Sequence, residues 1–307
     1  MADLEESLEI HFPRSSSMGY YARCLFRAAM DKALAAGELT IDTGFDPIAE
    51  RKRMNPPADA GTCIHWISQC KARCSFADPA DSARNTLPPQ AWDPARALAC
   101  KPEDKFYHSA LNLYKDGKRM ETTMNAVGDA VVQHLPPASG WYSELGYTMG
   151  PGLLGGHVDF TSFDLEDIVD LKTTGKPPKA GRIKYAHAVQ LCSYARLQHL
   201  AHGVLPKRLF ALYADRNGEW ILRTNPIMLD GSIPEHLQLY QHVCGLIDLV
   251  TSPLLDYAAV PQYDEVRCSD DFCPYRAYCQ RMLPHGKGVS DLTVLPEIQN
   301  PFTMKGL

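Results

Sequence analysis

Short apolar runs alternate with longer helical patterns along this chain. The short runs are bounded by glycine or polar turn residues, and they predict strands at residues 141–145, 157–160, 168–173, 209–214 and 219–223. The longer stretches predict helices at residues 18–36, 61–74, 106–134, 182–200 and 233–250. Between the last two strands, Asn217 and Gly218 predict a two-residue hairpin turn. The strands on either side of this turn should extend the same sheet as the others.

The predicted strands 157–160 and 168–173 read as one hairpin, and each carries an acid. Because side chains alternate between the faces of a strand, Asp170 and Lys172 should share one face while their neighbours point into a core. Charged groups on a buried strand are costly unless they have partners or a metal. Asp159 on the neighbouring strand supplies a second carboxylate, and two carboxylates can hold a divalent cation such as Mg²⁺. The alternative is an ordinary ion pair on a surface hairpin.

Length and composition predict one large domain or two small ones. The chain has 307 residues, of which 45% are hydrophobic, so it can bury a sizeable core. We expect one domain over residues 1–283, with a helical insertion at about 76–135 and a C-terminal tail at 284–307. No stretch is long and apolar enough to span a membrane, and the acidic start lacks a signal-peptide pattern. We therefore expect a cytoplasmic protein with no membrane partner, in which the ten cysteines are thiols or metal ligands.

Basic residues are concentrated after the predicted hairpin. The net charge is −5, yet no Asp or Glu occurs from residue 171 to residue 214. That window contains Lys172, Lys176, Lys179, Arg182, Lys184, Arg196, Lys207 and Arg208. A window of one sign that begins at a candidate metal site suits a groove that faces phosphates. The alternative is a solvated basic face balanced by acids elsewhere.

Three further groups of residues carry candidate chemistry. Gly61 and His65, four residues apart, open the second predicted helix. On the helix predicted after the hairpin, Gln190 and Tyr194 are also four residues apart and therefore lie on one face. Near the C-terminus, three cysteines fall within twelve residues: Cys268, Cys273 and Cys279. Three thiolates are one short of the four ligands that a structural tetrahedral metal site requires.

The order of these motifs resembles the RecB-like branch of the PD-(D/E)xK nuclease superfamily. The matching elements are a G-x-x-x-H on a helix, G-H-V-D-F, D-L-K eleven residues after the first acid, and Q-L-x-x-Y on the next helix. The resemblance covers most of the chain. It implies an α/β fold with a mixed central β-sheet flanked by helices, as in restriction endonucleases, with a helical insertion. It also implies a metal-dependent nuclease that acts on DNA.

The resemblance implies metal ligands among the matching residues. Asp159 and Asp170 would hold one or two Mg²⁺ or Mn²⁺ ions, with His65 as a further ligand. Glu144, on the strand before the hairpin, would be an additional ligand or would contact DNA. The alternative for Glu144 is a glutamate at a strand end that faces water.

The resemblance also implies residues that act on the substrate. Lys172 would position or activate the attacking water, while Gln190 and Tyr194 would line the site and contact the strand. The loop and helix start after the hairpin would bind the DNA backbone through Lys176, Lys179, Arg182 and Lys184.

The cysteines resemble those of RecB-like nucleases with an iron–sulfur cluster, which have one distant N-terminal cysteine and three near the C-terminus. Cys24 would be the distant ligand of a [4Fe–4S] cluster completed by Cys268, Cys273 and Cys279. Such a cluster would tie the N-terminal helix to the C-terminal segment across the nuclease core. Four thiolates also suit Zn²⁺, which stays open as the alternative.

The family implies exonuclease action on single-stranded or end-exposed DNA, in a bacterial cell or a phage-infected host. The chain has no helicase motif, so any unwinding would come from a helicase or recombination partner. The alternative is a catalytically inactive module for DNA binding or assembly, stapled by [4Fe–4S] or zinc. A third possibility is a zinc-stapled domain that binds proteins.

Overall fold

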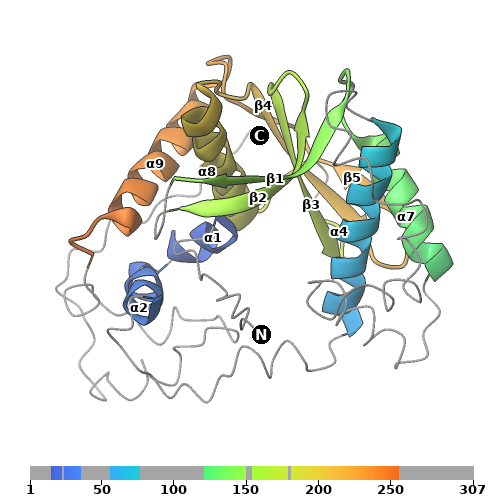
Figure 1. Cartoon of the computed structure of the whole chain (residues 1–307), viewed down its shortest axis with the longest axis horizontal. Helices are drawn as coiled ribbons and strands as arrows, with labels where there is room; N and C mark the ends of the chain where they lie inside the picture. Colours follow the sequence, from blue (N-terminus) through green and yellow to red (C-terminus); the bar gives the residue numbers. More distant parts are fainter. Residues whose placement is uncertain are drawn as a thin grey trace, which may run out of the picture.

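The structure is a computed structural model of the chain, and it describes residues 15–22, 24–35, 56–76, 121–149, 154–178 and 181–255. Within these residues, a sheet of six strands lies between two groups of helices (Figure 1). The helices are α1 (Met18–Tyr21), α2 (Leu25–Ala35), α4 (Pro56–Ser75), α7 (Glu121–His134), α8 (Tyr185–His202) and α9 (Pro234–Thr251). Helices α4 and α7 pack on one face of the sheet, and α8, α9 and α1 pack on the other.

The sheet is mixed, as the sequence predicts. Its strands are β1 (Trp141–Thr148), β2 (Gly155–Ser162), β3 (Asp167–Thr174), β4 (Arg208–Asp215), β5 (Ile221–Arg223) and β6 (Ile227–Met228). Strands β1, β2 and β3 are antiparallel neighbours, β3 and β4 are parallel, and both β5 and β6 pair antiparallel with β4. The predicted hairpin is therefore confirmed as β2 and β3, and the α/β fold is confirmed with it.

Strand β3 is covered on both faces. Val169 and Leu171 belong to the core under α4 and α7, whereas Ile168 belongs to the core under α8 and α9. By alternation, Asp170 and Lys172 lie on the α8 side. This confirms the predicted alternation and places an acid and a lysine inside a packed layer.

Helix α8 connects the parallel strands β3 and β4. A crossover helix of this kind carries the chain from the end of β3 back to the side of the sheet where β3 begins, so that β4 runs parallel to β3. The helix ends at Gly203, which has the left-handed φ of 71° and donates its N–H to the His199 carbonyl at 2.8 Å. As a result, the first turns of α8 lie beside the C-terminal end of β3.

Two expectations about helices are wrong in detail. The stretch 18–36 forms two helices, α1 and α2, and Cys24 lies between them instead of inside a helix. Helix α4 begins at Pro56, earlier than the expected start at Gly61. Proline is tolerated in the first turn of a helix, because the N–H groups there have no partner within the helix.

The turn after β4 also differs from the expectation. The N–H of Asp215 bonds to the Trp220 carbonyl, so the loop holds four residues where two were predicted. The Asp215 carboxylate accepts hydrogen bonds from the N–H groups of Asn217 and Glu219, which stabilises the wider loop. Among the described residues, no helix combines the length and apolar character needed to cross a bilayer.

Candidate active site

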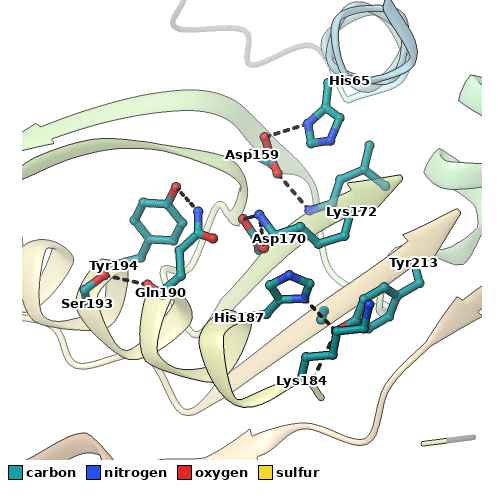
Figure 2. A network of polar contacts seen from close by, with 12 residues as sticks. His65, Asp159, Asp170, Lys172, Lys184, His187, Gln190, Ser193, Tyr194 and Tyr213 are labelled. Carbon is teal, nitrogen blue, oxygen red and sulfur yellow. Dashed lines mark hydrogen bonds and ion pairs between the residues drawn. The ribbon is translucent and has the colours of Figure 1, made fainter. Parts of the chain in front are cut away.

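Two acidic side chains come together where strands β2 and β3 separate. Phe160 and Val169 are paired across the two strands, and the next residues toward the site are Asp159 and Asp170. Both are buried, with Asp170 only 1% exposed. Figure 2 shows the two carboxylates between the helix that carries His65 and the helix that carries Gln190. The structure thus brings together the two predicted acids.

Where β2 and β3 separate, the Asp159 carboxylate accepts a hydrogen bond from a β3 backbone N–H. Its Oδ2 accepts a hydrogen bond from the Leu171 N–H at 2.7 Å, and its Oδ1 lies 3.3 Å from His65 Nδ1. Burial alone would raise the pKa of Asp159, but the charge and hydrogen bond of His65, the charge of Lys172 and the Leu171 amide together lower it. Asp159 is therefore held as an anion in the interior.

Asp170 is in the opposite electrostatic situation. Lys172 Nζ lies 3.0 Å from its Oδ1 and 2.8 Å from its Oδ2. Only the Oδ1 contact has hydrogen-bond geometry, and the buried Oδ2 has no hydrogen-bond partner. Burial, with the nearby charge of Asp159, outweighs the attraction of Lys172 and raises the pKa of Asp170 to about 6.

These donors fit a hard divalent cation. Carboxylate oxygens are the ligands that Mg²⁺ and Mn²⁺ prefer. The buried Asp170 Oδ2 has the Lys172 ammonium 2.8 Å away and no contact of hydrogen-bond geometry, so it keeps capacity to bind a cation. In the part of the chain that the structure describes, no three His, Cys, Asp or Glu residues already converge closely enough to enclose an ion.

Glu144 is joined to this site by a residue that the sequence analysis missed. Gln69 lies on α4 one turn after His65, and its Nε2 donates to Glu144 Oε1 at 2.8 Å and to Asp159 Oδ1 at 3.1 Å. Glu144 lies inside β1, not at a strand end, and its φ is 56°. The spacing of four residues from His65 was the available signal for Gln69, since it places both on one helix face.

Gln190 and Tyr194 form a buried pair on α8, on the side of the acids. Gln190 Nε2 donates to Tyr194 Oη at 2.8 Å. Burial raises the pKa of Tyr194 well above its usual value, and the charges of Asp170 and Asp159 raise it further. The hydroxyl therefore stays protonated. A Cβ atom at Gly156 would lie 3.0 Å from Tyr194 Cε1, so the glycine before the first acid gives the tyrosine ring room.

A second pair on α8 and β4 borders the site. His187 Nδ1 lies 2.8 Å from Tyr213 Oη, and the same oxygen accepts the Lys184 N–H at 3.2 Å (Figure 2). Tyr213 pairs with Lys172 in the parallel register of β3 and β4. Nothing in the sequence near Tyr213 marks it, because the contact depends on the crossover.

The glycine of the G-x-x-x-H motif has a packing reason. A Cβ atom at Gly61 would overlap Thr173 Oγ1, so the glycine allows α4 to approach the end of β3 closely. One turn later, the helix delivers His65, whose side chain is 26% exposed, to Asp159.

The basic window divides into two groups. Lys176, Arg182 and Lys184 are exposed on the connection from β3 to α8, next to Lys172, while Lys179 lies outside the described residues. Two other members of the window are paired at the start of the strands: Lys207 contacts Glu166, and Arg208 makes two hydrogen bonds, of 2.6 and 2.7 Å, to Asp167. The prediction of one basic face over the whole window is therefore too broad, because Lys207 and Arg208 are paired with acids.

Of the four cysteines predicted to bind a cluster, only Cys24 lies among the described residues. Cys24 is partly exposed between α1 and α2. Cys268, Cys273 and Cys279 lie outside the described residues, as does the predicted tail.

Three comparisons with known proteins bear on the family of this chain. A comparison with curated proteins gives no match. Among solved structures, a Eubacterium rectale protein provisionally named as an exonuclease is 12% identical, with 97% of this chain and 99% of that chain covered and a TM-score of 0.39. A protein named SSO0001 is 13% identical, with 72% and 86% covered and a TM-score of 0.26. The family model of the PD-(D/E)XK nuclease superfamily matches residues 15–280, and the chain therefore belongs to that superfamily.

Proposed function

We propose that the protein is a metal-dependent DNA nuclease, and that it acts as an exonuclease on single-stranded or end-exposed DNA. The observation that supports this most directly is the Asp159–Asp170–Lys172 group. It combines two buried carboxylates with a lysine, and the Asp170 Oδ2 has an ion-pair contact with Lys172 but no contact of hydrogen-bond geometry. A group of this kind is expensive in a protein interior unless a cation or substrate completes it.

Asp159 and Asp170 would hold Mg²⁺ or Mn²⁺, with His65 and Glu144 as further ligands. When bound, such an ion lowers the pKa of a water and neutralises charge at a phosphate. Lys172 Nζ lies beside Asp170 and is 22% exposed as a side chain, so it can reach a water or a phosphate oxygen without leaving the carboxylate.

Gln190 and Tyr194 would orient the bound strand. Gln190 donates to the tyrosine oxygen, so the tyrosine's own proton points elsewhere and can be donated to a phosphate oxygen. The raised pKa of Tyr194 keeps that proton in place. Lys176, Lys179, Arg182 and Lys184 would bind the backbone of the strand.

Substitution of Lys172 tests this assignment. Lys172→Ala should reduce cleavage by at least about a hundredfold and leave DNA affinity within about threefold, because the lysine acts on the reacting groups. Cleavage of labelled DNA and binding to the same DNA in chelator would be measured together. Loss of binding along with cleavage would count against the catalytic role.

The cysteine cluster is a separate proposal. Cys24 with Cys268, Cys273 and Cys279 would hold a [4Fe–4S] cluster, and Zn²⁺ is the competing metal. The support is the cysteine pattern of the sequence and the partial exposure of Cys24. Iron, sulfide and zinc contents of protein purified without oxygen would distinguish the two metals, and the absence of all three would reject the site.

A further inference from the structure

Gln69 contacts two carboxylates of the site at once. Its side-chain nitrogen lies 2.8 Å from Glu144 Oε1 and 3.1 Å from Asp159 Oδ1, and the residue is only 2% exposed. Carboxylates accept hydrogen bonds and do not donate them, so the amide group must present its NH₂ to both. An uncharged side chain thus uses its two donors to bridge two anions.

The two anions belong to adjacent strands. Ser143 pairs with Phe160 and Leu145 pairs with Val158, so Glu144 stands opposite Asp159 in the register of β1 and β2. At this position the Glu144 backbone adopts a φ of 56°, which a non-glycine residue rarely adopts inside a strand. Such a conformation persists only where the surroundings impose it, and it is found most often at functional sites.

Helix α4 contacts this part of β1 at two points. The Gln69 side chain holds the Glu144 carboxylate, and the Gln69 backbone carbonyl accepts a hydrogen bond from Ser143 Oγ at 3.3 Å. The contact between the Ser143 side chain and the helix backbone and the contact between the Gln69 side chain and the carboxylates can therefore be removed separately.

We propose that Gln69 is a positioning residue that holds Glu144 and Asp159 as a preformed pair of carboxylates for the divalent cation. The inference rests on the proposed metal-dependent nuclease. Asp159 is buried and Glu144 is partly exposed, and two carboxylates in register repel each other. A donor shared by both offsets this repulsion and keeps them together. Each carboxylate oxygen has two acceptor sites, so a donor bonded to one oxygen of each group leaves both groups able to contribute a ligand to a cation. Groups that orient metal ligands typically alter metal affinity by 10- to 100-fold when they are removed.

The test compares Gln69→Met with Ser143→Ala. Methionine keeps the length and volume of glutamine but cannot donate, whereas Ser143→Ala removes the bond to the Gln69 backbone and keeps the bonds of the Gln69 side chain. Binding of Mn²⁺ alone, without DNA, would be followed by electron paramagnetic resonance, and the metal concentration for half-maximal cleavage would be measured separately from kcat. We expect Gln69→Met to weaken Mn²⁺ binding roughly tenfold or more, with kcat largely recovered at saturating metal, and Ser143→Ala to bind within about twofold of the wild type.

Equal Mn²⁺ affinity for Gln69→Met and the wild type would overturn the inference. Circular dichroism would report folding, and Gln69→Glu, which keeps the shape and loses the amide donors, serves if the methionine variant does not fold. Failure of both to fold would assign Gln69 a structural role only and would also overturn it. A failure of the proposed function looks different, since the wild type itself would then bind no Mn²⁺ and cleave no DNA.

Discussion

The carboxylate of Asp159 accepts the backbone N–H of Leu171 at 2.7 Å, at the point where β2 leaves β3. The same side chain is a proposed metal ligand and a structural replacement for a sheet hydrogen bond. The separation of the strands opens space for the acids, and Asp159 satisfies the amide that the separation exposes. Formation of the site and formation of the sheet are therefore coupled through one side chain.

This coupling predicts a difference between two substitutions. Asp159→Ala leaves the Leu171 N–H buried without an acceptor, whereas Asp159→Asn retains an oxygen that can accept it. We expect Asp159→Ala to be less stable than Asp159→Asn by about 1–3 kcal/mol. Urea unfolding in the presence of chelator measures this difference. Equal free energies of unfolding would mean that the hydrogen bond to Leu171 does not contribute to stability.

Asp170 predicts a dependence of stability on pH in the metal-free protein. Its pKa is raised from 3.8 to about 6, so the folded state binds more protons than the unfolded state between these values. Stability from this group is present at low pH and is lost as the pH rises through about 6, by at most about 3 kcal/mol.

The comparison that isolates this effect is the wild type against Asp170→Asn, which cannot ionise. We expect the stability of the wild type relative to the variant to fall between about pH 4 and pH 6 in chelator. Parallel stability curves for the two proteins across this range would contradict the raised pKa.

The division of the basic window predicts which lysines bind DNA. Lys184 is exposed at the start of α8, whereas Lys207 is paired with Glu166 at the far end of β3. Lys184→Ala should weaken DNA binding and reduce the slope of log affinity against log salt by about 1, while Lys207→Ala should change neither. Fluorescence anisotropy over a salt series measures both the affinity and the slope. An equal effect of the two substitutions would contradict this division and support one basic face over the whole window.

Local sequence patterns were sufficient where the contacts are local. The β2–β3 hairpin and the one-turn spacing of Gln190 and Tyr194 are set within a few residues, and both were predicted correctly. The position of Gly61 and His65 on one helix is local as well. That this part of the helix lies close to the acids was predicted only from the resemblance to a family.

The missed residues depend on contacts between distant segments. Gln69 contacts partners 75 and 90 residues away, and the contact of Tyr213 with His187 requires the β3–α8–β4 crossover. No glycine marks the left-handed backbone at Glu144, whose carboxylate accepts a hydrogen bond from Gln69 of helix α4. Such features follow from the packing of the sheet against its helices.

The most direct test of the account uses end-labelled single- and double-stranded DNA. Protein purified without oxygen would be incubated with Mg²⁺, with Mn²⁺ or with chelator, alongside Asp170→Ala. We predict digestion that requires the metal and is lost in the variant, with a product ladder that gives the polarity. Absence of digestion by the wild type, or equal digestion by Asp170→Ala, would contradict the proposed nuclease site.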